Sequence, residues 1–594
     1  MRLRYPRRSP AIQTQQAHGA ASPDGGGACA LHGVASAAPA SAWSGLPASI
    51  ARLRPRLHGE TLIAGTSLYF AAFDNGAFWR AAVDAPLQQA GWIASLAVLV
   101  FAANAVLLSA LVWRWLAKPV VAALLLVSAL ASHYSAAYGV HIDADMIGNV
   151  LHTDLRESSE FLSGGLLLSL LSTAPALLVL WRIRLLPSAA LPGLVRRLVF
   201  VAAVGLAALL AAFGSSRELS ALIRNHREVR YLVAPANVLV SSLKLATEHE
   251  ERGPRFQVAG DAHLLPRTAG AKPRLLLIVV GETARAANWG LSGYARQTTP
   301  ELARRAGVVN FADVTACGSS TEVALPCMFS IQGREHYDSR AIRSHESLLH
   351  VLARTGVSVL WRDNQSGCKG VCDGLPVERL DSARDPAYCD GLRCRDGILF
   401  ADPAAWWGDG TRDRVVVLHM LGNHGPNYSD RAPPEFRRYQ PVCASADLGD
   451  CSREQIVNAY DNALLYTDHL LASAIDALQA QSRYDAALLY VSDHGESLGE
   501  NGLYLHGMPW PVAPEVQLRV PMIAWLSPAF AAATHLDTAC LASRAAQPLT
   551  HDHLFHSVMG ALGVASGSYR RDRDLFADCR PAAATASATP GTAK

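Results

Sequence analysis

The chain has 594 residues, which exceeds one ordinary domain, so two or three regions are expected. Its formal net charge of only +3 gives no support for a nucleic-acid partner. Hydrophobic residues make up 50% of the chain, and the mean hydropathy of +0.14 indicates that they are concentrated somewhere. They are concentrated in the first 215 residues, which predicts a membrane region followed by an exported one.

The chain begins with a polar tail. Residues 1–58 are rich in Ala, Gly, Ser, Pro and Arg, and no periodicity is visible in them. They lack the short apolar core of a signal peptide. We therefore predict a disordered cytoplasmic tail over residues 1–58.

Five apolar runs follow the tail. They are Thr61–Trp79, Trp92–Trp113, Val120–Val140, Phe161–Trp181 and Leu198–Gly214. Four of them are long enough, or nearly so, to cross roughly 30 Å of hydrocarbon as helices. The first is weaker because Asp74 interrupts it. Together the runs predict a transmembrane domain of five helices over residues 59–214.

Basic residues indicate how these helices are oriented. They gather in the tail and in the turns after the second and fourth runs: Arg52, Arg54, Arg56, Arg114, Lys118, Arg182, Arg184, Arg196 and Arg197. The loop between the third and fourth runs, HIDADMIGNVLHTDLRESSE, is acid-rich and belongs to the opposite side. Five crossings that start inside place everything after Gly214 outside.

Cysteine usage supports this topology. Eight of the eleven cysteines form close sequential pairs, Cys317/Cys327, Cys368/Cys372, Cys389/Cys394 and Cys443/Cys451. The spacing of the middle four also fits a structural zinc ribbon. An exported domain favours disulfides. Cys540 and Cys579 are candidates for a fifth bridge, and Cys29 is expected to be a free thiol on the inner side.

The exported part begins with a connector and continues as an α/β domain. Residues 215–272 are helix-like and amphipathic, which predicts linker helices on the membrane surface, with an ordinary packed linker as the alternative. Residues 273–577 contain short β-rich runs at 274–280, 357–361, 414–420, 486–492 and 520–525, separated by helical stretches such as Ile456–Gln479. Continuous apolar strands of this kind indicate a buried, mostly parallel sheet. Residues 578–594 are predicted to be a disordered tail.

Residues with metal-binding side chains follow the predicted strands. Glu282 follows the first, His419 lies at the end of the third and His424 follows it, and the pair Asp493 and His494 follows the fourth, with His506 a little further along. Sites in open α/β sheets lie beyond the carboxyl ends of strands. Mixed carboxylate and imidazole ligands suit zinc or manganese, and zinc is our first choice.

The stretch ACGSSTEVALPC, residues 316–327, places a hydroxyl run between two cysteines. Such a run before an apolar stretch can be a simple helix N-cap. A metal ion nearby would instead lower the pKa of a coordinated hydroxyl, and a helix start favours an anion. Thr321 is then a candidate nucleophile, and a bridge from Cys317 to Cys327 would hold its turn in place.

Five motifs resemble one known family: GETARAANWGLSGYARQTTP, CGSSTEVALPCMFS, WRDNQSGCKGVC, LHMLGNHGPNY and SDHGESLGENGLYLHGMP. They are similar to those of the lipid A phosphoethanolamine transferases, a group that includes the mobile colistin-resistance enzymes. The resemblance runs from about residue 62 to residue 575. It implies an alkaline-phosphatase-like α/β/α sandwich domain in the periplasm, anchored in the inner membrane by five helices.

The resemblance also implies roles for individual residues. Zinc ligands would be Glu282, Thr321, Asp493 and His494, with Thr321 as nucleophile; one zinc is tightly bound, and a second during turnover is left open. His419, His424 and His506 would bind the phosphate or an additional zinc and carry protons. Ser366 and Lys369 would lie near the phosphoryl group, and Lys369 also suits phosphate as a point charge.

Asn149, Thr153 and Glu157 match positions that contact the phosphoethanolamine head group. Their spacing of four residues predicts that they share one helical face. Without the resemblance, we would interpret this face as a solvent-exposed surface with no binding role. His152, beside it, departs from the family pattern and puts the donor contacts there in doubt.

The implied reaction moves phosphoethanolamine from phosphatidylethanolamine to a lipid A phosphate through a phosphothreonine-type intermediate. Masking the negative charge of that phosphate would weaken the binding of cationic peptides such as polymyxin. We expect a membrane-embedded monomer without nucleic-acid partners. The alternatives are the same donor with another acceptor, a lipopolysaccharide core sugar or a periplasmic glucan, or transfer of glycerol phosphate. A sulfatase is disfavoured because CGSST lacks the Pro and Arg of a C/S-x-P-x-R motif, and no sugar site is recognisable. A non-catalytic sensor is disfavoured because all four zinc ligands are present.

Overall fold

The structure is a computed structural model that describes residues 54–83, 90–113, 115–153, 155–225, 227–248, 255–391 and 393–581. Most of the two predicted tails, and with them Cys29 and Arg52, lies outside the described residues, as does Arg114. The chain divides into a unit over residues 1–54 and a second unit from Pro55 onward. Everything below concerns the second unit.

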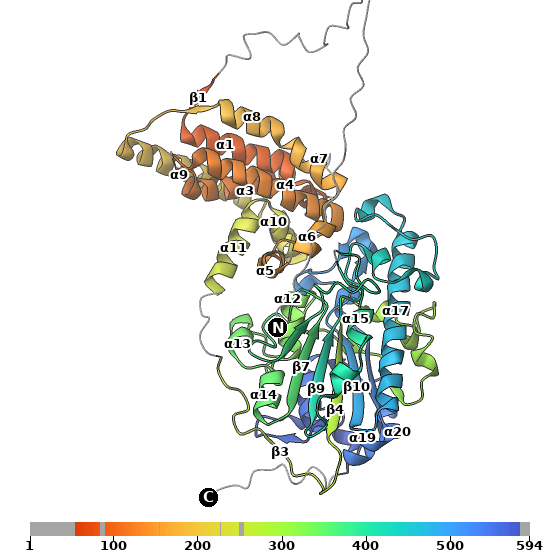
Figure 1. Ribbon diagram of the computed structural model, residues 1–594. Coiled ribbons are helices and arrows are strands. Elements are labelled where there is room, and N and C mark those ends of the chain that lie inside the picture. Colours follow the sequence, from red (N-terminus) through yellow and green to blue (C-terminus); the bar gives the residue numbers. More distant parts are fainter. Residues whose placement is uncertain are drawn as a thin grey trace, which may run out of the picture. The chain divides into compact units, whose positions relative to one another are not determined.

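The first part of this unit is helical (Figure 1). Its apolar helices are α1 (Gly59–Tyr69), which continues as the π-helix η2 (Phe70–Asp74), then α2 (Gly76–Ala82), α3 (Ala90–Leu111), α4 (Ala117–Tyr138), α7 (Gly164–Ser172), α8 (Ala174–Arg182) and α9 (Ala190–Gly214). Among the described residues, four helical segments are long and apolar enough to cross a membrane: Ala90–Leu111, Ala117–Tyr138, Gly164–Arg182 and Ala190–Gly214. The first predicted run is not one of them. The 11 residues of α1 and five of η2 span only about 24 Å at 1.5 Å per residue, because the helix breaks after Asp74.

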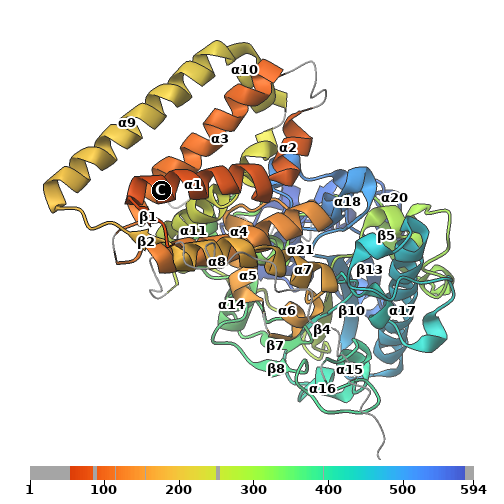
Figure 2. The same cartoon turned by 90° about the horizontal axis from the view of Figure 1, so that it is seen from above.

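The long helix α9 exposes most of its apolar side chains. It packs against α3 (Figure 2), yet Val204 is its only buried residue. Leu209 and Phe213 expose 69% and 85% of their surfaces. Apolar side chains exposed over a whole helix are rare in water-soluble proteins and mark contact with a membrane.

Two short helices, α5 (Ala144–His152) and α6 (Leu155–Glu160), lie between α4 and α7. The prediction that Asn149, Thr153 and Glu157 share one helical face is wrong. Thr153 ends α5 in an extended conformation, with φ −71° and ψ 132°, and its hydroxyl donates to the backbone oxygen of Asn149 at 2.7 Å. Threonine hydroxyls offer the backbone such local alternatives to a continuing helix. Glu157 therefore lies on the separate helix α6.

The connector also consists of pieces rather than one helix. It contains α10 (Ser216–Asn225), the 3₁₀ helix η3 (Arg227–Leu232) and α11 (Ala236–Glu248). The break comes at Ala234 and Pro235, since proline has no N–H for a continuing helix. The Asn75 side chain accepts from the Ala234 backbone nitrogen at 2.8 Å and donates to its oxygen at 2.9 Å. At this point the connector is packed against the helical region.

A seven-stranded sheet forms the second part of the unit. In spatial order its strands are β5 (Val308–Phe311), β13 (Met522–Leu526), β10 (Asp485–Ser492), β4 (Arg274–Gly281), β9 (Arg414–His419), β7 (Ser358–Asp363) and β8 (Val377–Arg379). From β10 to β8 all neighbours are parallel, and β13 is antiparallel to both of its neighbours. All five predicted runs are strands of this sheet. The two strands that were not predicted are β5, which alternates in burial, and β8, which is exposed.

Helices cover both faces of the sheet, so the domain is an α/β/α sandwich (Figure 1). Alternate residues of β4 enter different cores: Ile278 belongs to the core with α14 (Leu348–Arg354) and α21 (Asp552–Ala561), and Val279 to the core with the long α17 (Arg453–Ala480). All eight residues of β4 are buried. Burial on both faces explains why the central strands are continuous apolar runs.

The cysteines of this domain are paired. The structure contains the disulfides Cys317–Cys327, Cys368–Cys372, Cys389–Cys394, Cys443–Cys451 and Cys540–Cys579. The alternative of a zinc ribbon built from the middle four cysteines is therefore wrong, because their sulfurs are bonded in pairs.

Candidate active site

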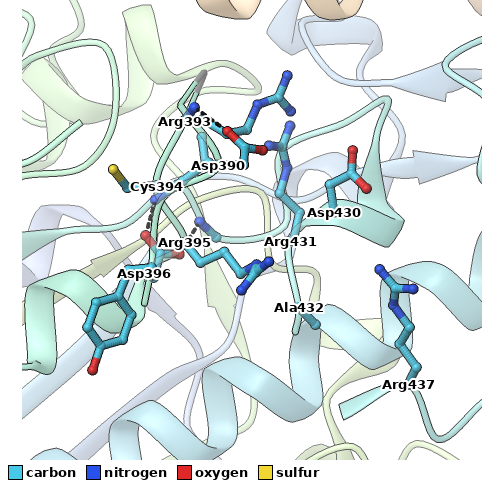
Figure 3. A pocket seen from close by; sticks show the side chains of 12 residues that line it. Asp390, Arg393, Cys394, Arg395, Asp396, Asp430, Arg431, Ala432 and Arg437 are labelled. Carbon is cyan, nitrogen blue, oxygen red and sulfur yellow. Dashed lines mark hydrogen bonds between the residues drawn. The ribbon is translucent and has the colours of Figure 1, made fainter. Parts of the chain in front are cut away.

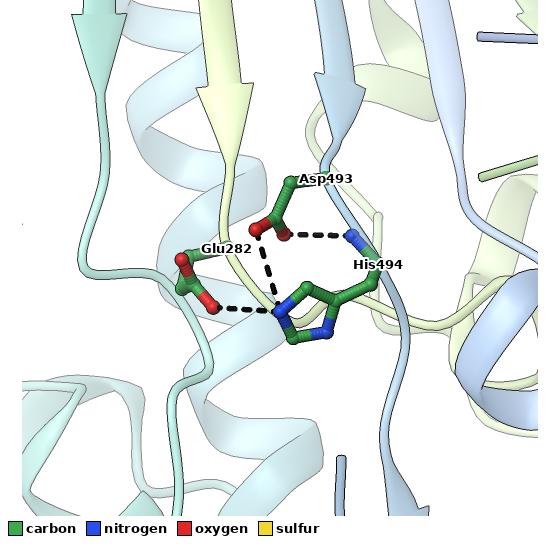
Figure 4. Close-up of side chains that lie close together, drawn as sticks. All are labelled: Glu282, Asp493 and His494. Carbon is green, nitrogen blue, oxygen red and sulfur yellow. Dashed lines mark hydrogen bonds and ion pairs between the residues drawn. The ribbon is translucent and has the colours of Figure 1, made fainter. Parts of the chain in front are cut away.

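Two neighbouring strands bring the central residues of the site together (Figure 4). The parallel strands β4 and β10 end in register, with Gly281 opposite Ser492, so the next residues, Glu282 and Asp493, lie at the same edge of the sheet. His494 follows Asp493. Glu282, Asp493 and His494 are fully buried, and each offers a ligand atom within 4.8 Å of the others. This is the edge where sites of α/β sheets lie.

Thr321 completes this group. It is the first residue of α12 (Thr321–Met328), and its Oγ1 lies 3.0 Å from Glu282 Oε2 and 3.3 Å from His494 Nε2. His494 Nε2 is in turn 3.3 Å from Glu282 Oε1 and 3.4 Å from Asp493 Oδ2. The N-cap residue Ser320 makes no side-chain capping bond. The hydroxyl run is therefore not a capping device here, and Thr321 faces the carboxylates.

Backbone geometry fixes the turn after β4. Thr283 has a φ of 60°, a left-handed conformation that costs a β-branched residue on the order of 1–3 kcal/mol. Its N–H donates to Asp493 Oδ1 at 3.1 Å and its hydroxyl to Glu282 Oε1 at 2.6 Å. At Gly422, with φ 53°, a Cβ would lie 2.5 Å from the backbone oxygen of Glu282. Only glycine lets the 421–426 loop approach the site this closely.

The charges of the group suit a divalent cation. Burial, together with the negative charge of Glu282, raises the pKa of Asp493 to about 7. Burial opposes charge on Glu282 as well, but its hydrogen bond with His494 holds its pKa well below the usual range. Asp493 Oδ2 accepts no hydrogen bond from any described residue. A cation between the carboxylates would relieve their repulsion and occupy that oxygen, so Glu282, Asp493, His494 and the Thr321 hydroxyl fit a metal ion.

Three further histidines surround this group. The ring centre of His506 lies 4.4 Å from that of His494 and 5.2 Å from that of His424. His506 Nδ1 is 3.3 Å from Glu496 Oε1. His419, the last residue of β9, has its Nδ1 3.3 Å from Asp363 Oδ2. Burial alone would lower the pKa of His419, but the negative charge of Asp363 raises it.

Sequence reasoning missed three residues of the site. Asp363, the last residue of β7, orients His419, and Glu496 pairs with His506. Gln365 donates from Nε2 to Glu282 Oε2 at 3.0 Å. All three lie two to four residues after the end of a predicted strand, close to the position that marked Glu282 and Asp493. They stayed unnoticed because a single Asp, Glu or Gln at a strand end is not distinctive by itself.

Residues predicted to contact the donor come from two separate parts of the chain. Lys369 Nζ donates to Ser366 Oγ at 2.7 Å and to the backbone oxygen of His152, the last residue of α5, at 3.4 Å. His152 Nδ1 is 3.0 Å from Glu322 Oε1, and Glu322 directly follows the Thr321 hydroxyl. The end of α5, where Asn149 and Thr153 lie, is thus next to Lys369 and the start of α12.

A group of arginines and carboxylates joins α6 to the loop of His424; two of its arginines, Arg393 and Arg431, are drawn in Figure 3. Arg431 is buried; its Nε donates to the backbone oxygen of His424 at 2.6 Å, and its Nη2 bonds the carboxylate of Glu160, the last residue of α6. Arg393 pairs with the same carboxylate. Arg393 and Arg431 line a small cavity of about 70 Å³ with Asp396. The joint fixes α6, which carries Glu157, relative to His424.

Comparisons with known proteins agree with this architecture. An α/β/α sandwich with a buried hydroxyl among carboxylate and imidazole groups defines the alkaline phosphatase and sulfatase class, and the Sulfatase family model matches residues 274–564. The model of the phosphoethanolamine transferases EptA/EptB matches residues 100–249.

Individual relatives match most of the chain. It is 35% identical to the phosphoethanolamine transferase EptA of Escherichia coli (strain K12), over 89% of this chain and 98% of that protein. It is 36% identical to the phosphatidylethanolamine transferase Mcr-1 of Escherichia coli, over 87% of this chain and 96% of that protein. The solved structure of the integral membrane lipooligosaccharide phosphoethanolamine transferase A of Neisseria meningitidis superposes with a TM-score of 0.84 and 34% identity, covering 89% of this chain and 100% of that one. The chain belongs to the phosphoethanolamine transferase family.

Proposed function

We propose that this protein transfers phosphoethanolamine from phosphatidylethanolamine to a phosphate of lipid A, with Thr321 as the covalent nucleophile. The position of Thr321 carries the proposal. Its hydroxyl is 3% exposed at the start of α12 and lies within hydrogen-bond distance of both Glu282 and His494. The names of the relatives support the transferred group.

Zinc is the proposed cofactor. Glu282, Asp493, His494 and the Thr321 oxygen would hold one ion, and this set of oxygen and nitrogen donors without a thiolate suits zinc. When bound, it would acidify the Thr321 hydroxyl and offset negative charge at the phosphoryl group. Candidates for binding a second ion or the phosphate are His419, His424 and His506. The buried Nε2 of His419 has no hydrogen-bond partner among the described residues.

The protein's own groups would carry out two displacements. First, the Thr321 hydroxyl gives up its proton to a histidine of the site while its oxygen attacks the phosphorus of phosphatidylethanolamine, and the bond from phosphorus to diacylglycerol breaks as His424 or His506 delivers a proton to the leaving oxygen. Lys369 and Ser366 orient the donor phosphate, while Asn149, Thr153 and Glu157 contact its ethanolamine. Second, a lipid A phosphate oxygen attacks the phosphorus held on Thr321, and the threonine oxygen regains its proton. The turn between Cys317 and Cys327 keeps the nucleophile in position.

The proposal includes a location. We place the helices of residues 59–214 in the inner membrane with five crossings, α1 and η2 forming the first, and the α/β domain of residues 273–577 in the periplasm. Residues 215–272 lie along the membrane surface, and the protein acts as a monomer. Five disulfides between Cys317 and Cys579 support an oxidising compartment.

Mass spectrometry of lipid A tests the proposal. A polymyxin-sensitive Gram-negative host would express the chain, a Thr321→Ala variant and a Thr321→Ser variant. Wild type should add a phosphoethanolamine mass to lipid A, Thr321→Ala should not, and Thr321→Ser should retain part of the activity because it keeps a hydroxyl. If lipid A stayed unmodified although folded wild-type protein was present in the membrane, lipid A would be rejected as the acceptor. Core sugars and glucans from the same cells would then be searched for phosphoethanolamine or glycerol phosphate.

A further inference from the structure

A cavity of about 850 Å³ lies next to α12, the helix that begins with Thr321. One wall comes from α12 and includes Glu322, which directly follows Thr321. The segments 340–347 and 366–373 form much of the rest, with Arg255, Phe256 and Arg379. Ligand sites in proteins measure about 300–1,000 Å³, so this cavity has the size of a substrate site.

The lining of the cavity carries more positive than negative charge. Its cations are Arg255, Arg340, Arg343, Arg379 and Lys369, and its carboxylates are Glu322, Glu346 and Asp373. Five cations against three carboxylates leave a surplus of two positive charges, with histidines counted as neutral. A concave surface with such a surplus attracts an anionic ligand.

The surplus of positive charge belongs to Arg340 and Arg379. Arg343 pairs with Glu322 at 2.6 Å and Arg255 with Asp373 at 3.0 Å, while Glu346 pairs with Arg354, which is outside the lining. Arg340 donates to the backbone oxygen of Thr247. Within the described part of the chain, no carboxylate lies within 4.0 Å of the guanidinium of Arg340 or Arg379, and both side chains are exposed.

An aromatic ring faces the same space. Phe256 exposes 61% of its surface, although its backbone is held on both sides, by bonds to Ser344 at 2.8 Å and to Glu346 at 3.0 Å. Its ring centre lies 5.3 Å from that of His345. A fixed, exposed aromatic ring at the edge of a charged cavity offers an apolar face to a ligand that is otherwise polar.

We propose that this cavity binds the phosphorylated sugar head group of the acceptor, with Arg340 and Arg379 as partners of a phosphate and Phe256 against a sugar ring. The inference rests on the proposed function. The donor fits the cavity less well, because its phosphoethanolamine group is small and its ammonium cancels the charge of its phosphate. Ser366 and Lys369, the proposed partners of the donor phosphoryl group, also line this cavity, so a phosphoryl group held on Thr321 and the acceptor would share these two residues.

Measuring the two half-reactions separately distinguishes an effect on donor binding from an effect on acceptor binding. Full-length protein in detergent would receive phosphatidylethanolamine alone, and diacylglycerol release and the mass of the Thr321 peptide would be measured. Hexa-acylated lipid A, which carries two sugar phosphates, would then be titrated to obtain the acceptor KM. The variants are Arg340→Ala with Arg379→Ala, and Arg379→Lys alone. Arg305→Ala is the matched control, because Arg305 pairs with Asp476 and does not line the cavity.

We expect the double variant to load Thr321 at a rate within about twofold of wild type. Its acceptor KM should rise at least tenfold, since it loses two charge-assisted contacts. Arg379→Lys should lie in between, and Arg305→Ala should match wild type. The same acceptor KM in the double variant and wild type would overturn the inference, and slower loading of Thr321 would assign the cavity to the donor instead. Failure of wild type itself to load Thr321 would reject the proposed function and this inference with it.

Discussion

The strand-end cluster and the α5–α6 segment are held in place in very different ways. Glu282 and Asp493 follow two paired strands whose sixteen residues are all buried. By contrast, α5 and α6 have nine and six residues, and Asn149 and Thr153 are only partly buried. Both regions were predicted to contact the same phosphoethanolamine group.

This difference matches two tasks. Reacting groups have to be held to within about half an ångström, which buried strands can do. A lipid head group has to enter and leave, and short helices with few buried contacts belong to the less stable parts of a protein. We therefore expect substitutions at the strand ends to remove the chemistry and substitutions on α5 to weaken donor binding.

The largest effect is expected for Asp493→Asn. It keeps the shape but removes a charge from the group that fits the metal, so bound zinc should be lost and transfer should fall by about three orders of magnitude or more. Metal content by mass spectrometry and transfer to lipid A would be measured together. Asp485→Asn, at the opposite end of the same strand, is the control and should behave like wild type. Full metal content and activity in Asp493→Asn would refute the assigned ligand.

Arg431→Met tests the joint between the two regions. Among the described residues it leaves the buried carboxylate of Glu160 with Arg393 alone, and it removes a bond to the His424 backbone, so the free energy of unfolding should fall by about 3 kcal/mol. Denaturant titration measures this. Adding Glu160→Gln should restore part of the loss, because the unbalanced charge disappears. Simple additivity of the two changes would show that the pair is not coupled.

Much of this architecture could be predicted, for a physical reason. A strand buried on both faces has to be a continuous apolar run, so β4, β9 and β10 and the residues that follow them stand out in the sequence. The edge strands β5 and β8 lack that pattern. The break at Thr153 arises from a hydroxyl competing for the backbone, which spacing alone does not reveal. The ion pair of Arg431 with Glu160 joins residues 271 positions apart and leaves no local signal.

The environment of His551, which contacts the turn that carries Thr321, predicts that the stability of the protein depends on pH. Its Nδ1 accepts from the Cys317 N–H at 3.1 Å, and its Nε2 lies 3.0 Å from the backbone oxygen of Ser492. Burial lowers the pKa of His551 to about 4. The unfolded chain, with a histidine pKa near 6.5, therefore binds more protons than the folded one between about pH 6.5 and 4.

Stability should then fall as the pH drops through that window, by up to about 3 kcal/mol from this one residue. Denaturant midpoints of purified protein at pH 4.5, 5.5 and 7 would show it. His551→Gln cannot take up a proton, so its profile should be flatter than that of wild type, although its stability at pH 7 is lower. Parallel profiles for the two proteins would mean that His551 does not titrate in this range.

The smallest effect is expected for Asn149→Ala on α5. Loss of one hydrogen bond to the donor, worth about 1 kcal/mol, should raise the KM for phosphatidylethanolamine about fivefold and leave kcat unchanged. Val150→Ala is the matched control, since Val150 is the next residue and exposes 61% of its surface. If Asn149→Ala instead lowered kcat at unchanged KM, α5 would contribute to the transition state. The contrast between a rigid strand-end cluster and an adaptable head-group segment would then fail, because both would position the reacting phosphorus.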